Sequence, residues 1–521
     1  MRTALRGKGA SRSQTSSIDS YAAPVGGWNA RDSLANMQHT DAITLENWFP
    51  RSSYVEFRGG SASHATGMTG IAKTLASYNA LTGTHKLFAF TDSGTYDVSA
   101  AGAVGASVLA RTNSKHQVNL FGDGTYNYLI ACNGVDKPAY YNGTTWTAVD
   151  SVSTPALTGV TTTALIASMT FKGRLIFLVN DSLSFYYLAA GSAGGALTAF
   201  DLSGEFTRGG YLMACATWTR DSGRGVDDYA VFITSEGEAA VYQGTNPNSA
   251  ATWAKVGSYS IGRPLGRRCL AQYGGDCVVI TESGVYPLSA LLANGDEERS
   301  KFAMSYKIQS AMSEAARSYG TLYGWKIIVF PKQDAMLVNI PVLEEVEQKQ
   351  YVMNTVTKAW CNFTKWNAED FAVFDGELYF SNGTAVYKAW TGTDDEGANI
   401  TFYGKQAFSD FGTPKTKQCK MFMPILAVTG DITYLSDVDI DFEDGNIAAS
   451  APYTASAGST WDVALWDFAY WSSTTRVIKR WSSPSEYTGR FLAGKIKIET
   501  QLLTGQWIGS TMMYEVVDSI G

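Results

Sequence analysis

The sequence predicts an all-β protein that combines a β-propeller of about seven blades with a C-terminal β-sandwich-like domain. A phrase made of an apolar run, a polar turn with glycine and then a tyrosine recurs along the chain. Aromatic residues make up 13% of the sequence and glycine occurs 51 times, a composition typical of many short strands and turns. The best helical candidate, 310–317, is short, and no stretch shows a long helical periodicity.

The recurring phrase gives the propeller its predicted period. It is clearest at 87–96, 231–242 and 278–286, and each copy predicts a buried strand, a tight turn and a returning strand. Weaker copies occupy 129–141, 175–187, 327–338 and 378–387. Successive copies are roughly 45 to 55 residues apart, which is the length of a propeller blade, so six to eight blades are compatible with the chain. A β-sandwich with coincidental spacing is the alternative.

Tryptophans follow several copies of the phrase, at Trp146, Trp253 and Trp360. The segment 354–360 predicts a hairpin whose tryptophan packs between neighbouring blades. The propeller is expected to span 65–395, and propellers close by pairing a strand from one end of the unit with a blade from the other.

Two segments precede the propeller. Residues 1–23 read as a polar N-terminal arm, in which several basic residues oppose only Asp19. The arm is either a solvated tail or a segment that orders against a neighbouring subunit. Residues 24–64 are rich in glycine and proline but also in aromatic residues, which predicts an extended latch that joins the core of the tube and propeller.

The recurring pattern of apolar run, glycine-containing turn and tyrosine ends near residue 396. Residues 396–521 are predicted to form a second β domain. Its strand 432–442 alternates apolar residues with Asp437, Asp439 and Asp441. A calcium loop is disfavoured there because the sixth-position glycine and the terminal glutamate are missing. We expect instead a strand with one acidic face.

Charge and cysteine usage limit the class of protein. A net charge of −7 argues against an outer face that grips nucleic acid through its phosphates. The chain has no apolar run long enough for a membrane span and no apolar signal-peptide core at its start. The six cysteines lack CxxC spacing, so we expect free, mostly buried thiols and synthesis in a reducing cytoplasm.

No catalytic, cofactor-binding or metal-binding residues are assigned, and the chain is predicted not to be an enzyme. The four histidines form no metal pair, and neither a nucleophile elbow nor a phosphate-binding loop is present. One alternative stays open because 92–96 resembles part of the Asp-box turn of sialidase propellers. A propeller-type protein that binds or degrades glycans is therefore the second hypothesis. Trp461, Trp466 and Trp471 are read as core, with a carbohydrate or partner platform as the minor alternative.

Two stretches carry a resemblance to a known family. The first spans 26–50, and the residues that we take as its assembly signature are Gly27, Arg31, Asp32, Asp41, Asn47, Trp48 and Pro50. The second is the tryptophan-rich stretch 461–471. Both resemble tail nozzle, or tail tubular, proteins of short-tailed bacteriophages.

The resemblance implies a structural virion protein that is made in the bacterial host cytoplasm. Six copies would form a ring below the portal and head–tail adaptor, with tail fibres or tailspikes as further partners. The ring would surround the distal DNA channel, retain the packaged genome and open for ejection, and double-stranded DNA would pass without sequence-specific binding. No cofactor is implied. In this setting the strand bearing Asp437, Asp439 and Asp441 is a candidate lining of the lumen, because negative charge cannot hold phosphates tightly.

Overall fold

Short β-strands dominate the structure, and helices are few and short. The computed structural model describes residues 16–80, 83–221, 226–293, 299–430, 432–447, 475–484 and 488–517. The chain divides into a propeller unit, Arg58–Ile400, and a sandwich unit built from the segments up to Phe57 and from Thr401 onward. The limits predicted from the sequence are 65–395 for the propeller and 396–521 for the second domain.

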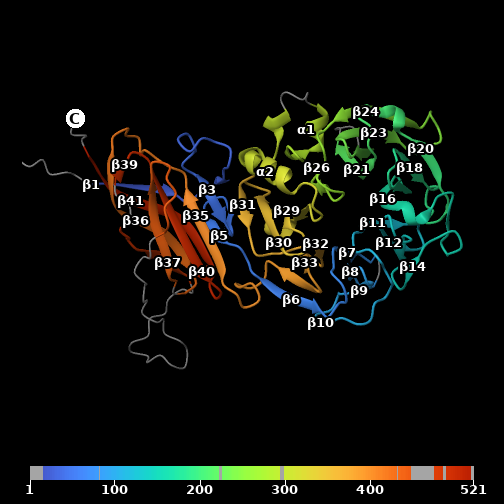
Figure 1. The fold of residues 1–521 in the computed structure, drawn as a ribbon, viewed down its shortest axis with the longest axis horizontal. Coiled ribbons are helices and arrows are strands. Elements are labelled where there is room, and N and C mark those ends of the chain that lie inside the picture. The colour runs from blue at the N-terminus through green and yellow to red at the C-terminus, as the bar shows by residue number, and fades with distance from the viewer. Residues whose placement is uncertain are drawn as a thin grey trace, which may run out of the picture. The chain divides into compact units, whose positions relative to one another are not determined.

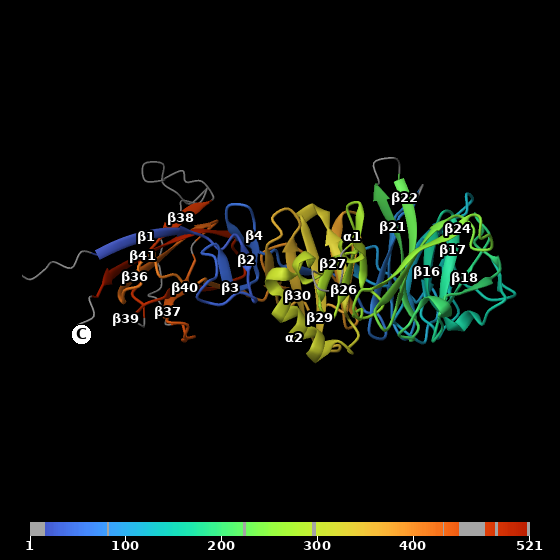
Figure 2. The same cartoon turned by 90° about the horizontal axis from the view of Figure 1, so that it is seen from above.

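The propeller unit is a succession of small antiparallel sheets that follow one another in chain order (Figure 1). The first sheet contains β7 (Thr74–Tyr78), β8 (Lys86–Phe90) and β9 (Thr95–Asp97). The second contains β11 (Gln117–Gly122), β12 (Asn127–Cys132), β13 (Ala139–Tyr141) and β14 (Trp146–Ala148). The third contains β16 (Leu165–Phe171), β17 (Arg174–Val179), β18 (Ser184–Tyr187) and β20 (Thr198–Asp201). The fourth contains β21 (Leu212–Asp221), β22 (Val226–Thr234), β23 (Glu238–Gly244) and β24 (Trp253–Ser260). The fifth contains β25 (Leu270–Tyr273), β26 (Asp276–Thr281) and β27 (Gly284–Pro287). In Figure 2, β21 and β22 reach beyond the other strands of this unit.

The last two sheets complete the circle. One contains β28 (Lys326–Phe330), β29 (Ala335–Leu343), β30 (Glu347–Asn354) and β31 (Trp360–Phe363). The other contains β32 (Asp370–Phe374), β33 (Glu377–Asn382) and β34 (Ala385–Ala389), and it is closed by β6 (Ser61–Thr66), which runs antiparallel to β34 and also pairs with β10 (Gly102–Ala103). The two ends of the unit therefore share one sheet, in which β6 pairs with β34. The predicted all-β propeller is confirmed.

Aromatic side chains fill the space between successive sheets. Trp146 packs edge-on against Phe88 and Phe90 of the preceding sheet, with ring centroids 5.0 and 5.6 Å apart. The predicted hairpin around Trp360 is present as β30 and β31, and Trp360 is fully buried with its indole N–H donating to the carbonyl of Met304 over 2.8 Å. Trp146 also lies against Tyr141 of its own sheet, with ring centroids 5.2 Å apart, so this one ring packs against two sheets.

Few other elements occur in this unit. β15 (Leu157–Thr158) and β19 (Gly195–Ala196) form a short parallel pair. The predicted helix is present as α2 (Gln309–Tyr319), which buries Met312, Ala315 and Ala316. A second helix is α1 (Leu288–Ala293). All six cysteines are free, as expected, and five are buried.

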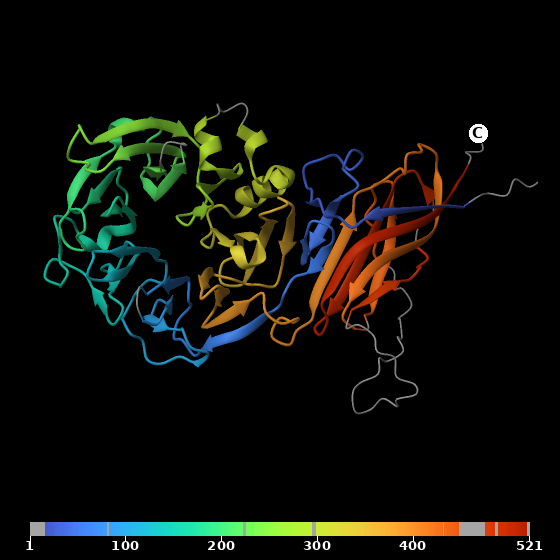
Figure 3. The same cartoon turned by 180° about the vertical axis from the view of Figure 1, so that it is seen from behind.

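The sandwich unit has strands from both ends of the sequence (Figure 3). One sheet has the order β38 (Arg476–Lys479), β36 (Lys417–Val428), β41 (Gly505–Val516), β5 (Val55–Phe57) and β4 (Trp48–Pro50), with β1 (Ser16–Ala22) on β41 and β39 (Thr488–Gly489) on β36. The other contains β3 (Asp41–Glu46), β35 (Ile400–Gln406), β40 (Leu492–Thr500) and β37 (Tyr434–Ile440), with β2 (Gly27–Trp28) beside β3. Apolar residues of both sheets share a core that includes Phe422, Val438, Leu492 and Met512.

The N-terminal part of the chain corrects one sequence-based interpretation, that of the arm. Residues 16–22 are not part of an unstructured arm but form β1, antiparallel to β41 from Ser16 opposite Glu515 to Ala22 opposite Gly509. The segment read as a latch contributes β2 to β5 to the sandwich unit. The physical reason is that β41 has a second edge, which β5 and β1 cover in turn. Residues 1–15 lie outside the described part of the chain.

Candidate functional site

The residues of the predicted assembly signature fall into two groups in the sandwich unit. Asn29 connects the first group, since its side-chain amide donates to Asp32 over 2.9 Å and to Asp41 over 2.8 Å. Arg31 forms an ion pair with Asp32. Gly27, at φ 79°, pairs with Asp41 at the start of β2 and β3. The positive φ explains the glycine, because a side chain is disfavoured there.

The second group forms the core next to β4. Asn47 has φ 60° and donates from Nδ2 to the carbonyl of Thr401 over 2.7 Å. Trp48 is fully buried and contacts the rings of Phe57, Phe402 and Trp507, with centroids 4.9, 5.8 and 5.7 Å away. Pro50 follows in the same strand and is also buried. These contacts join the N-terminal segment to the strands that come after the propeller.

The predicted acidic strand does not present its carboxylates to solvent. Asp437 and Asp439 are only 1% and 2% exposed, and Asp439 Oδ2 lies 2.6 Å from Nζ of Lys405. Asp439 also forms an ion pair with Lys495, which lies on the adjacent strand β40. Of the three, only Asp441 is exposed, at the end of the strand. A lumen-lining role is therefore wrong for Asp437 and Asp439, because both side chains are buried inside the unit, where Asp439 pairs with two lysines. The tryptophan-rich stretch 461–471 lies outside the described residues.

A cavity opens in the propeller unit where the first strands of the sheets begin. These first strands pack side by side around the unit. The cavity has a volume of about 540 Å³ and is lined mainly by residues that precede β11, β25 and β28, together with Met213 of β21. Its lining includes Lys115, Arg267, Arg268, Tyr323, Trp325 and Glu344. A concave site that collects side chains from several sheets is the usual place for a ligand in such a fold.

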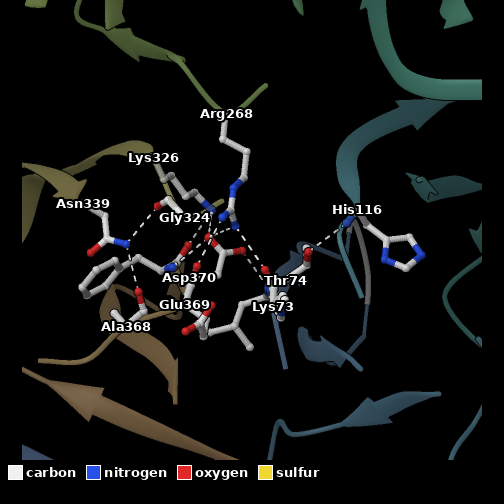
Figure 4. Close-up of polar contacts among 12 residues, drawn as sticks. Lys73, Thr74, His116, Arg268, Gly324, Lys326, Asn339, Ala368, Glu369 and Asp370 are labelled. Atoms are coloured by element: carbon white, nitrogen blue, oxygen red, sulfur yellow. Dashed lines mark hydrogen bonds and ion pairs between the residues drawn. The ribbon is translucent and has the colours of Figure 1, made fainter. Parts of the chain in front are cut away.

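A buried charge network lies beside this cavity (Figure 4). Oδ1 of Asp370, whose side chain is fully buried, lies 2.7 Å from Nη1 of Arg268 and 2.7 Å from Nζ of Lys326. Its Oδ2 accepts the backbone N–H of Leu75 over 2.8 Å. Burial lowers the pKa of Lys326, and the neighbouring carboxylate of Asp370 acts in the opposite direction. One buried carboxylate is therefore shared by two cations.

Tyr323 links the network to the cavity wall. Its ring lies 4.5 Å from Nζ of Lys115 and 4.6 Å from Cζ of Arg268, and its hydroxyl donates to the carbonyl of Lys73 over 3.2 Å. Cations over an aromatic face are stabilised by the ring quadrupole. The arrangement offers positive charge and an aromatic surface, which suits binding or packing. Among Lys115, Arg268, Tyr323, Lys326 and Asp370, no nucleophile is paired with a base.

Sequence reasoning missed this network because its members are far apart in the chain. The only local signal is the pair Glu369 and Asp370 placed directly before an apolar strand. Burial raises the pKa of Glu369, whose Oε1 accepts from Nε2 of Gln348 over 2.9 Å. In the described ranges, no group of three or more His, Cys, Asp or Glu side chains is placed to hold a metal ion. Across the same ranges, no helix has the length and apolar character needed to span a membrane.

Comparison with known proteins identifies only the fold. No protein-family model matches the chain, and no curated protein matches it. Among solved structures, the chain is similar to the β-propeller domain of Cps50 (Swd1) from Myceliophteria thermophila, with 10% identity over 64% of this chain and 100% of that one and a TM-score of 0.40. BBS1N, solved in complex with ARL6DN, is also 10% identical, over 65% and 99% of the two chains, with a TM-score of 0.39. YCF48 from Cyanidioschyzon merolae is 11% identical over 66% and 98%, with a TM-score of 0.33.

Proposed function

We propose that the chain is a structural subunit of the tail nozzle of a short-tailed bacteriophage. In this proposal about six copies form a ring below the adaptor and portal, as the family resemblance implies, and the ring retains the genome until DNA is ejected. The observation that carries the proposal is the two-unit organisation. The chain leaves the sandwich unit after Phe57 and returns to it at Thr401, so the propeller is an insertion in a β-sandwich.

The predicted signature residues support the same proposal. They lie at the N-terminal strands of the sandwich unit, where Asn47 and Trp48 contact Thr401 and Phe402. The segment that carries the family resemblance thus stabilises the unit that would form the tube. The net charge of −7 is compatible with a channel wall that lets DNA slide.

The edge strand β1 offers a surface for contact between copies. Among the described residues β1 pairs only with β41, so the backbone groups on its other edge have no strand partner. Every second residue of β1 is exposed, and the Ile18 side chain is 57% exposed. An open, partly apolar edge is a template for pairing with another chain.

The proposal is tested by mass measurement and electron microscopy of the purified protein, alone and together with the adaptor ring. We expect closed rings of about six copies on the adaptor. A protein that stays monomeric in the presence of the adaptor would contradict the proposal.

A matched pair of variants then tests the β1 edge. Ile18→Lys places a charge on the edge, and Val356→Lys places the same charge on a propeller position that is 70% exposed. Both proteins should fold with unchanged melting temperatures, and only Ile18→Lys should lose rings. Equal ring yields would exclude β1 from the interface.

A further inference from the structure

A second cavity lies in the propeller unit, away from the charge network. Its volume is about 550 Å³, and it is lined by the hairpin turns of the β11–β14 sheet and by two loops, around 154–156 and 191–194. The turns are closed by side chains: Asp123 accepts the backbone N–H groups of Thr125 and Tyr126, and Asn142 accepts those of Thr144 and Thr145. Such turns hold both side chains at the rim in fixed positions.

One wall of this cavity is made of three tyrosines in contact. The ring centroids of Tyr126 and Tyr128 are 5.7 Å apart, and those of Tyr128 and Tyr140 are 5.8 Å apart. Tyr126 is 48% exposed, whereas Tyr128 and Tyr140 are 7% and 1% exposed. The wall therefore consists of one exposed ring, that of Tyr126, followed by the buried rings of Tyr128 and Tyr140.

Several polar groups of the lining are not used by the protein itself. The Tyr140 hydroxyl is buried and has no hydrogen-bond partner. The turn engages only the oxygen of the Asn142 amide, so its nitrogen is left to donate. A buried hydroxyl without a partner is costly, which makes a ligand that satisfies it energetically favourable.

The chemistry of the lining selects the class of ligand. Asp123 is the one charged residue in it, so an anionic ligand would meet a negative charge and no cation. The tyrosine rings touch one another, which leaves no gap between facing rings for a quaternary ammonium group. Hydroxyl, amide and carboxylate groups around an exposed aromatic face match a neutral ligand that has an apolar face and many hydroxyls.

We propose that this cavity binds one pyranose ring of a neutral glycan. The apolar face of the sugar lies on Tyr126, and its hydroxyls bond to Asp123, to Asn142 Nδ2 and to the Tyr140 hydroxyl. The inference does not depend on the proposed nozzle function, because binding of a sugar and assembly of a ring are measured separately.

The first experiment uses saturation-transfer NMR on the full-length protein with the methyl glycosides of glucose, galactose, mannose and N-acetylglucosamine. At least one glycoside should receive saturation, and Tyr126→Ala should weaken its affinity by about tenfold or more. The control Tyr306→Ala removes another exposed tyrosine, 37% exposed, and should leave binding unchanged. No transfer to any of the four, or equal affinities for wild type and Tyr126→Ala, would overturn the proposal.

The second experiment separates binding from folding. Tyr140→Phe removes the unpartnered hydroxyl but keeps the ring, so it should leave the melting temperature of the free protein equal or higher and still weaken binding. Asn142→Asp keeps an oxygen for the turn and removes the amide donor, and it should also weaken binding while the fold is retained. If both variants bind the glycoside as tightly as the wild type, the assignment of these two groups is wrong.

Discussion

Oδ1 of Asp370 lies 2.7 Å from Nη1 of Arg268, although Asp370 belongs to the sheet that closes the propeller and Arg268 lies just before the sheet that contains β25. Asp370 is the first residue of β32, and Arg268 precedes β25 by two positions. Through Oδ2 the same carboxylate also accepts the N–H of Leu75 in β7. One buried side chain therefore connects three parts of the propeller. These are the last sheet, which contains β32, the first sheet, which contains β7, and the segment that leads into β25.

Removing that carboxylate should be strongly destabilising. Asp370→Asn removes the buried carboxylate that Arg268 and Lys326 both contact, so we expect a loss of about 3–5 kcal/mol in the free energy of unfolding. Urea titration followed by tryptophan fluorescence measures it. The double variant Asp370→Asn/Lys326→Met should recover part of the loss, because it removes one of the two cations that the carboxylate contacts.

The control for this variant is Asp375→Asn. Asp375 pairs with His85 at the surface, with a side chain that is 56% exposed, and the change should cost no more than about 0.5 kcal/mol. Equal losses for Asp370→Asn and Asp375→Asn would show that the network adds nothing beyond a surface ion pair.

The strand β37 offers a second matched comparison. Asp439→Asn leaves Lys405 and Lys495 without their shared carboxylate, and a loss of about 3–5 kcal/mol is expected. Asp441→Asn keeps an oxygen that can accept the N–H groups of Arg490 and Phe491, and asparagine tolerates the positive φ of 48°. It should therefore cost little. The readout is urea unfolding of both variants, and a stable Asp439→Asn would reject the buried ion-pair account.

Local features of the propeller were predictable from the sequence. The repeated phrase predicted the strands of the propeller because a hairpin depends on residues close together, as in β26 and β27, where Thr281 pairs with Gly284. The hairpin that ends at Trp360 was predicted for the same reason. The burial of Trp360 follows from its size and apolar character alone.

Contacts between distant residues were not predictable in this way. The alternation of Asp437 and Asp439 indicated a charged face, but it could not show that Lys495 would lie opposite Asp437 in the register of β37 and β40. Likewise, β1 pairs with β41 at the other end of the sequence, and nothing local to 16–22 indicates that partner. Ion pairs and sheet edges are completed by tertiary structure, which local pattern does not encode.

A third prediction concerns Asn47, which combines a left-handed backbone with a side-chain hydrogen bond to Thr401. Asn47→Gly loses the hydrogen bond but accepts the backbone geometry, so it should cost about 1 kcal/mol. Asn47→Ala loses the hydrogen bond and must also adopt the left-handed region, which adds about 1–2 kcal/mol. Chemical denaturation ranks the variants, and an alanine variant as stable as the glycine variant would show that the backbone is not constrained at this position.

The last prediction concerns the dependence of stability on pH. His116 is 1% exposed, its ring centroid lies 4.4 Å from that of Phe90, and its Nε2 accepts from Nδ2 of Asn133 over 3.1 Å. Burial, reinforced by the charge of Arg111, lowers the pKa of His116 from 6.5 to about 3, against a smaller opposing effect of Asp136. Between these two values the unfolded chain binds a proton that the folded chain does not bind.

Stability should therefore fall as the pH drops from 6.5 towards 3, with a contribution from His116 of about 1.4 kcal/mol per pH unit. His116→Gln cannot titrate in this range, so its free energy of unfolding should depend on pH less steeply by that amount. Urea titrations of both proteins at pH 7, 6, 5 and 4 give the two slopes, and carboxylates common to both cancel in the difference. Because the test compares slopes, it holds even if the variant is less stable at every pH. Parallel slopes would mean that His116 is protonated in the folded protein, which would contradict its burial as a neutral side chain.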